Sequence, residues 1–196
     1  MRAALAVAAA VLLSAAAPRP GQPAPDFEGR TAGGETVRLS DFAGERVILE
    51  WTNADCPFVQ KHYGAGNMQA LQRRMTADGT VWLSVVSSAP GKQGHVTPAE
   101  ARALTKDRKA APTHVILDES GEIGRLYGAM TTPHMYVVDE AGTLRYAGAI
   151  DTIRSADPAD IARADNYVAD AMTALREDRA VVVPQSQPYG CSVKYE

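Results

Sequence analysis

Two cysteines, Cys56 and Cys191, carry the nucleophilic chemistry expected of this chain of 196 residues. Cys56 follows an apolar run that ends at Trp51 and a polar turn, Asn53–Asp55, and it is followed by Pro57. Proline is favoured at the first position of a helix, where its missing N–H costs nothing. Cys56 is therefore expected where a strand ends and a helix begins. The positive end of the helix dipole stabilises a thiolate there, and such thiols titrate at about pH 3.5 to 7.5 instead of about 8.5.

Cys191 supplies the second thiol, and two hypotheses remain open for it. An even pair of cysteines in an oxidising compartment is typical of a structural disulfide, which over so long a loop would stabilise the fold by about 4–5 kcal/mol in the chain-entropy model. Alternatively, Cys56 attacks a substrate and Cys191 releases the mixed disulfide, as thiol–disulfide exchange requires. The position of Cys56 favours the redox role. A catalytic disulfide should have a reduction potential above about −300 mV, and a structural one a potential below it.

The elements that must position these thiols follow from the hydrophobic pattern. Apolar runs predict strands at 46–51, 80–86, 114–118, 135–139 and 143–148, and a short hairpin between 26 and 39 with its turn at 32–34. Helices are expected at 67–75, from Pro98 after a Thr97–Glu100 capping box, and at 122–127. A last helix is expected from its apolar stripe at Ile161, Ala164, Val168, Met172 and Leu175. This alternation indicates an α/β sandwich with a central mixed sheet.

The composition describes one ordinary globular domain. Hydrophobic residues make up 45% of the chain and charged residues 22%, and the net charge is −3. That charge gives no support to nucleic-acid binding or to an anionic membrane surface. We expect the domain to span residues 18–183, followed by a C-terminal tail, 184–196, that carries Cys191.

The first 17 residues are typical of a signal peptide. Met1–Arg2 is basic, and the apolar run Ala3–Ala17 is shorter than the about 20 residues that span a bilayer. Small residues from Ser14 onward offer cleavage sites. We therefore expect removal of residues 1–17 and a soluble protein, periplasmic or secreted, with no stable membrane association.

Five motifs, in their order and spacing, resemble the thioredoxin-fold redoxin family, which includes peroxiredoxin-like and AhpC/TSA-like periplasmic thiol–disulfide proteins. They are Pro25-Asp26-Phe27, the segment 39–44, the strand end 51–56, Thr132-Pro133, and the segment 139–148. The resemblance implies a thioredoxin-like three-layer sandwich, with a central mixed sheet flanked by helices.

The resemblance also implies site residues: Cys56, Cys191, Thr132 and Pro133. In this fold the proline opposite the active cysteine is cis, and the backbone of the preceding residue pairs with substrate like an added strand. Two positions depart from the family pattern. Val59 stands where thioredoxins carry a second cysteine.

The other departure concerns peroxide. Asn53 stands where peroxiredoxins have a Thr or Ser three residues before the cysteine, and Thr52 lies one step further away. This weakens the peroxidase hypothesis. Thiol–disulfide exchange and peroxide reduction therefore both remain open.

The resulting hypothesis is an exported thiol-based oxidoreductase with Cys56 as nucleophile and Cys191 as candidate resolving cysteine. Its partners would be a protein or small-molecule thiol, disulfide or peroxide, and an external reductant, with no cofactor and no nucleic acid. The alternative is a non-catalytic binding module, or a copper-binding chaperone-like protein, with a structural Cys56–Cys191 disulfide. Cys56 and His134 are weak candidates for a metal, because His134 follows Pro133 and should lie near the thiol.

Overall fold

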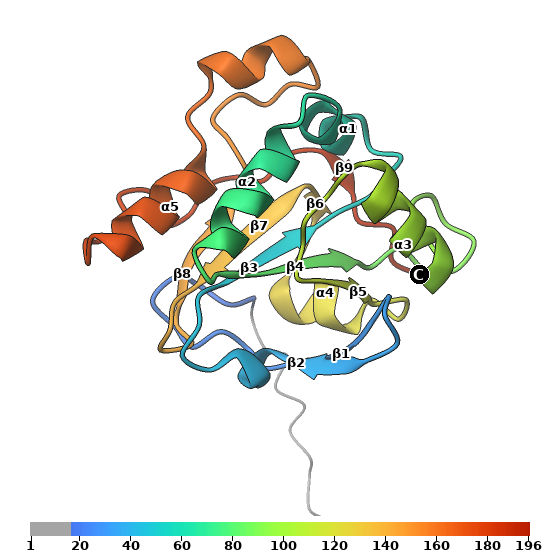
Figure 1. The fold of residues 1–196 in the computed structure, drawn as a ribbon, viewed down its shortest axis with the longest axis horizontal. Coiled ribbons are helices and arrows are strands. Elements are labelled where there is room, and N and C mark those ends of the chain that lie inside the picture. The colour runs from blue at the N-terminus through green and yellow to red at the C-terminus, as the bar shows by residue number, and fades with distance from the viewer. Residues whose placement is uncertain (1–16) are drawn as a thin grey trace, which may run out of the picture.

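The computed structural model describes residues 17–196, and the signal peptide expected over 1–17 lies outside the described residues except for Ala17. Its centre is a seven-stranded mixed sheet in the order β2-β1-β5-β4-β3-β7-β8 (Figure 1). The strands are β1 (Glu28–Thr31), β2 (Thr36–Arg38), β3 (Val47–Trp51), β4 (Val81–Val86), β5 (His114–Leu117), β7 (His134–Val138) and β8 (Leu144–Gly148). A separate two-stranded sheet joins β6 (Thr131–Thr132) to β9 (Cys191–Ser192).

The centre of the sheet is parallel and its flanks are antiparallel. β3 pairs in parallel with β4, and β4 with β5, whereas β7 runs antiparallel to β3. All residues of β3 and β4 are buried, which explains why both appear in the sequence as short, mostly apolar runs without alternation. β3 delivers the chain to Cys56.

Helices cover both faces of the sheet and make three layers, as expected from the sequence. On one face, α1 (Pro57–Gly64), α2 (Asn67–Ala77) and α5 (Tyr167–Arg176) share an apolar cluster with β3 and β7. The other face packs against α4 (Glu122–Tyr127) and the N-terminal hairpin. α3 (Pro98–Asp107) packs on a smaller cluster at the end of β4. Among residues 17–196, no helix is long and apolar enough to cross a membrane.

The signals at helix ends act as predicted. Cys56 is the N-cap of α1 and Pro57 its first residue, and α1 ends at Gly64. Gly66, with φ +74°, is the N-cap of α2. The Thr97 hydroxyl and the Glu100 side chain form the expected capping box of α3.

The prediction for the last helix was wrong at its start. Residues Pro158–Arg163 form a 3-10 helix, and α5 begins only after Asn166, whose side chain accepts a hydrogen bond from the N–H of Ala169. This cap sets the start of the helix, so the residues before Asn166 are not part of it. Ile161 and Ala164 therefore do not continue the face of α5 that packs on the sheet; they line a cavity of about 350 Å³.

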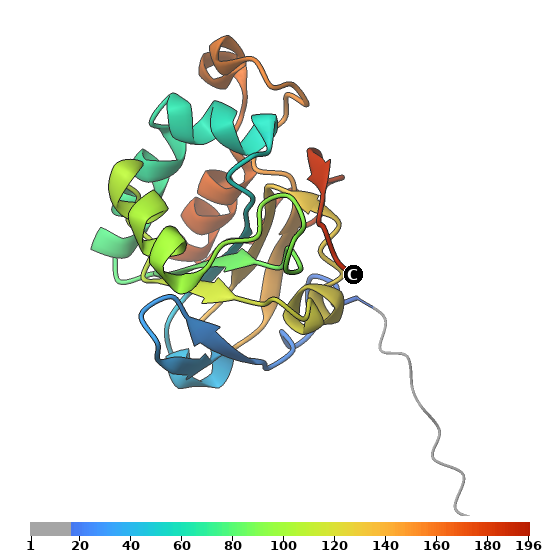
Figure 2. The same ribbon diagram turned by 90° about the vertical axis from the view of Figure 1, so that its right-hand side faces the viewer.

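The C-terminal tail is built into the molecule. Gln185 bridges to Ala147 beside β8, and the chain then crosses to form β9 against β6. Figure 2 shows this last segment, in red, running beside the yellow strands and ending near α4. The tail thus connects one edge of the sheet with the loop that precedes β7.

Candidate active site at the two cysteines

Cys56 is held by a hydrogen-bonded turn at the end of β3. Its N–H donates to the carbonyl of Asn53 at 3.2 Å, and the Asn53 side chain accepts from the N–H of Asp55 at 2.8 Å. The thiol is fully buried and donates to the carbonyl oxygen of Thr132, with 3.0 Å between Sγ and O. The side chain therefore points away from solvent and toward the loop before β7.

A second loop locks this turn. The Asn53 amide donates to the carbonyl of Gln93 at 3.3 Å, and the N–H of Gly94 donates to the Asp55 carboxylate at 3.2 Å. A Cβ at Gly94 would lie 2.3 Å from the Asn53 side chain, and φ there is +83°, so this close approach requires glycine. Asn53, at 1% exposure, consequently serves to shape the turn.

The bond between Thr132 and Pro133 is cis, as predicted. Thr132 pairs antiparallel with Cys191, and Thr131 with Ser192. The tail approaches very closely here: a Cβ on Gly190, where φ is +132°, would lie 2.0 Å from the carbonyl oxygen of Thr132. Thr132 thus contacts both cysteines, since its carbonyl accepts from Cys56 and its backbone pairs with Cys191.

The two thiols are free and electrostatically unlike. Burial raises the pKa of Cys56, but hydrogen bonds from the Thr132 side chain, from the N–H and thiol of Cys191 and from the Val59 N–H outweigh it, and the pKa lies below its usual value. Burial, followed by the hydrogen bond and charge of Cys56, raises the pKa of Cys191 to about 11. Of the pair, Cys56 is therefore the thiol that ionises more easily.

His134 lies on the other face of the sheet from Cys56. The His134 ring packs on Tyr136, with 4.6 Å between ring centroids, and its Nδ1 lies 3.4 Å from the N–H of Met130. Burial lowers the pKa of His134 to about 3. Cys56 belongs to the apolar cluster that contains Met135, on the opposite face of the sheet from Tyr136. Within residues 17–196, no group of three or more His, Cys, Asp or Glu side chains is arranged to hold a metal ion.

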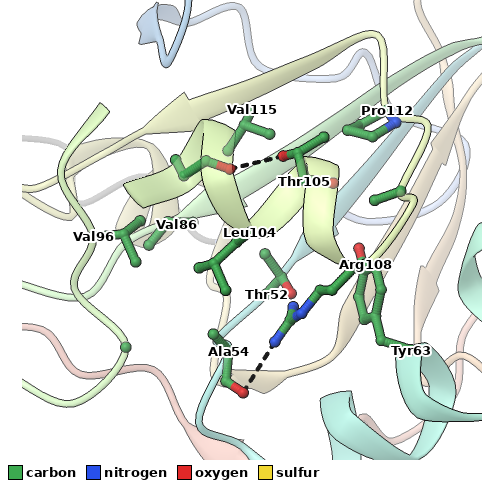
Figure 3. A pocket seen from close by; sticks show the side chains of 14 residues that line it. Thr52, Ala54, Tyr63, Val86, Val96, Leu104, Thr105, Arg108, Pro112 and Val115 are labelled. Carbon is green, nitrogen blue, oxygen red and sulfur yellow. Dashed lines mark hydrogen bonds between the residues drawn. The ribbon is translucent and has the colours of Figure 1, made fainter. Parts of the chain in front are cut away.

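Thr52 lines a different cavity, shown in Figure 3, with α3 and the end of β4. There Arg108 donates to the carbonyl of Ala54 at 3.1 Å and lies over the ring of Tyr63, 4.7 Å from its centroid. Apart from Ser84 and Thr105, the remaining walls are apolar, and the Thr52 hydroxyl is buried without a hydrogen-bond partner. A hydroxyl and a guanidinium thus lie behind the turn that precedes Cys56, whereas the Cys56 thiol itself faces Thr132.

One group beside the site could not be found from the sequence. The Asp151 cluster consists of Lys61 and His62 of α1, Asp151 after β8, and Tyr189 of the tail, all at most 4% exposed. Lys61 Nζ donates to Asp151 Oδ2 at 3.3 Å, and the Tyr189 hydroxyl donates to Asp151 Oδ1. These residues come from three distant parts of the chain and form no motif. A lysine without solvent contact is the only unusual feature, and burial is not visible in sequence.

Several known proteins are similar to this chain in sequence or in fold. The Thioredoxin-like protein YneN of Bacillus subtilis is 29% identical over 125 residues, which is 64% of this chain and 68% of that protein. A hypothetical protein from Sinorhizobium meliloti has a TM-score of 0.76 at 22% identity, covering 90% of this chain and 94% of its own. A putative Thiol:disulfide interchange protein DsbE from Chlorobium tepidum has a TM-score of 0.54 at 24% identity, with 67% and 85% covered.

At these identities the structural likenesses establish the fold, which is thioredoxin-like, with a central mixed sheet flanked by helices. The AhpC/TSA family model matches residues 20–147, well over half of the sequence, and this segment contains β3, Cys56 and the Thr132–Pro133 bond. The chain therefore belongs to the AhpC/TSA family, within the thioredoxin-like redoxin superfamily.

Proposed function

We propose that this protein is an exported thiol–disulfide oxidoreductase in which Cys56 is the nucleophile and Cys191 the resolving cysteine. One observation carries the proposal: a buried, helix-capping Cys56 and the tail residue Cys191 meet at Thr132, beside a cis proline. The thioredoxin-like neighbours, among them a putative thiol:disulfide interchange protein, support this class of substrate.

The reaction proceeds in two exchanges. The Cys56 thiolate attacks one sulfur of a substrate disulfide, forms a mixed disulfide and releases the first substrate thiol. Cys191 then gives up its proton and attacks the Cys56 sulfur, which forms the Cys56–Cys191 disulfide and releases the second substrate thiol. The substrate is reduced by two electrons, the two cysteines are oxidised, and an external thiol reductant restores them.

The unequal pKa values of the two thiols suit these roles. A pKa of Cys56 below the usual value provides the attacking thiolate, while the pKa of about 11 keeps Cys191 protonated until the mixed disulfide has removed the neighbouring negative charge. Because the charge and hydrogen bond of Cys56 contribute to the raised pKa, formation of the mixed disulfide lowers it. The resolving thiol is thereby activated only after the first step.

Peroxide reduction is the second candidate, and membership of the AhpC/TSA family favours it. Thr52 and Arg108 offer a hydroxyl and a guanidinium near the cysteine turn. They line the cavity behind that turn, whereas the Cys56 thiol faces Thr132 and the tail. Exchange with disulfides therefore has the stronger geometric support.

The test is to trap the intermediate. Cys191→Ser should accumulate a mixed disulfide at Cys56 when the protein is mixed with oxidised glutathione, visible as an added glutathione by intact mass. The wild-type protein should end as the internal disulfide, and Cys56→Ser should remain unmodified at position 56. A normal or raised pKa of Cys56 with no adduct in Cys191→Ser would instead support a non-catalytic binding module.

Export is part of the proposal and is tested separately. The intact mass of natively expressed protein should lack the residues up to a site between Ser14 and Ala17. Retention of Met1 or Arg2 would contradict export while leaving the thiol chemistry unaffected.

A further inference from the structure

The tail is anchored next to Cys191 by a buried tyrosine. Tyr189, two residues before Cys191, is 4% exposed, and its ring meets the edge of Phe58 with 5.7 Å between centroids. Its hydroxyl donates to Asp151. A polar tail of Pro, Ser, Gln and Gly residues therefore has one deeply buried side chain close to its reactive thiol.

Asp151 receives donors from three separate parts of the chain. Oδ2 accepts from Lys61 Nζ at 3.3 Å and lies 3.7 Å from His62 Nε2, and Oδ1 accepts from the Tyr189 hydroxyl and from the N–H of Ile153 at 3.1 Å. Lys61 Nζ also lies 5.8 Å from the centroid of the Tyr189 ring. An unpaired buried charge is costly, so this carboxylate favours the conformation in which Tyr189 is present.

The same cluster contacts the helix that carries the nucleophile. Phe58 and Lys61 both lie on α1, the helix whose N-cap is Cys56. Between Tyr189 and Cys191 stands only Gly190, whose lack of a side chain allows the tail to contact Thr132. Asp151 thus links the position of Cys191 to that of Cys56 through a few rigid, buried contacts.

We propose that Tyr189 is a positioning residue, which through its hydrogen bond to Asp151, supported by Lys61, presents Cys191 to the Cys56 sulfur. The inference rests on the proposed exchange and goes beyond it: it assigns a role to residues that take no part in either exchange step. Cys56 is fully buried when the tail is docked. The hydrogen bond between Tyr189 and Asp151 therefore favours the internal disulfide over a mixed disulfide with an external thiol.

The experiment measures a ratio of two products. The protein is equilibrated with a fixed mixture of reduced and oxidised glutathione, quenched with acid and separated by mass into the internal disulfide and the glutathione adduct at Cys56. Tyr189→Phe keeps the ring on Phe58 and removes only the hydroxyl. Since a hydrogen bond to a charged group is lost, the adduct should increase roughly tenfold relative to the internal disulfide.

Tyr167→Phe is the matched control: it also removes a hydroxyl from a tyrosine, one whose ring stacks on Tyr146 and which does not belong to the Asp151 cluster. Its ratio should equal that of the wild type. Asp151→Asn is the second variant and should shift the ratio in the same direction as Tyr189→Phe but by a smaller factor, because its uncharged amide oxygen is a weaker acceptor for Tyr189. If Asp151→Asn does not fold, Tyr189→Phe decides alone.

The outcomes separate the inference from the proposed function. A ratio within twofold of wild type in Tyr189→Phe, with a lowered melting temperature, would make the residue merely structural and overturn the inference. Failure of the wild type to form any internal disulfide would overturn the proposed function instead.

Discussion

Glu50 and Asp151 are both buried carboxylates on the face of the sheet covered by α1 and α2, but they are satisfied in different ways. Glu50 accepts hydrogen bonds from a set of donors that all belong to the central strands and their covering helices: Tyr63, Gln72, Trp82 and Ser84. Asp151 accepts from Lys61 of α1 and from Tyr189 of the tail. One carboxylate is enclosed by the rigid domain, and the other depends on a segment that carries a reactive thiol.

This difference predicts that the Glu50 cluster affects only the stability of the fold, whereas the Asp151 cluster also affects the reaction between the two cysteines. All four donors to Glu50 are present whatever the tail does, so the Glu50 cluster contributes equally to the dithiol and disulfide forms. The donors to Asp151 are complete only when the tail is docked. A change at Glu50 should therefore alter folding alone, and a change at Asp151 should alter both folding and the position of Cys191.

The largest effect is expected from Glu50→Ala. Four buried donors lose their acceptor at once, and each buried group left without a partner costs about 1–3 kcal/mol. After relaxation we expect a loss of about 5 kcal/mol in the free energy of unfolding, measured by urea denaturation. In protein that remains folded, the ratio of internal disulfide to glutathione adduct should not change; a shift like that of Tyr189→Phe would remove the distinction between the clusters.

Asp151→Asn should lower the free energy of unfolding by less, about 3 kcal/mol. The amide keeps an oxygen for Tyr189 but leaves Lys61 buried without its counter-charge. The double variant Lys61→Met/Asp151→Leu sharpens the comparison. Replacing a buried ion pair by apolar side chains restores stability. The double variant should therefore unfold at higher urea than Asp151→Asn and yet show a raised glutathione adduct, since leucine leaves Tyr189 without an acceptor. If the double variant recovered both its stability and the wild-type ratio of internal disulfide to glutathione adduct, Tyr189 would have no role in positioning Cys191.

Acid should act on the two clusters with opposite sign. Burial lowers the pKa of His62, in the Asp151 cluster, to about 4, so the unfolded chain binds a proton near pH 6.5 that the folded one does not. Stability is therefore lost as pH falls from about 6.5 to 4, by about 3 kcal/mol from this group. Burial raises the pKa of Glu50, so protonation of Glu50 favours the folded state as pH falls.

Urea midpoints between pH 7 and pH 4 measure this dependence. His134, whose pKa is lowered to about 3, adds a slope of the same sign as His62. His62→Gln isolates its contribution: the variant should lose less stability on acidification than the wild type. Equal slopes in the two proteins would show that His62 is protonated alike in folded and unfolded chains.

The sequence predicted the part of this comparison that depends on local signals. The strand before Cys56 and Pro57 at the helix start follow from periodicity and backbone preferences, and the structure confirms them. The cis bond before Pro133 was implied by family resemblance and is also confirmed. The strand and the helix start require only neighbouring residues, whereas the cis bond was known from the resemblance alone.

The remainder depends on contacts between distant segments. Nothing local marks Glu50 as the acceptor of four donors, or Lys61 as a buried cation, because both occur within ordinary element patterns. The stripe from Ile161 to Leu175 predicted too long a helix because the cap at Asn166 overrode its spacing. The docking of the tail on Thr132 depends on Gly190 and Tyr189, whose roles appear only when β6 and Asp151 are brought beside them.

The smallest effect expected is a shift in the titration of Cys56. Hydrogen bonds from the Thr132 side chain, and then from the N–H and thiol of Cys191, lower the pKa of Cys56. Loosening the tail by Tyr189→Phe weakens the Cys191 donors and leaves Thr132 in place, so the pKa of Cys56 should rise by a fraction of a unit. The ultraviolet absorbance of the thiolate measures this pKa without requiring a reagent to reach the buried thiol. The absorbance of the matching Cys56→Ser protein is subtracted from that of the wild type and from that of Tyr189→Phe. Glu50→Gln, which keeps the shape of the rigid cluster, should leave the midpoint unchanged; an equal shift in both variants would mean that general loosening of the domain, and not the tail, controls the thiolate.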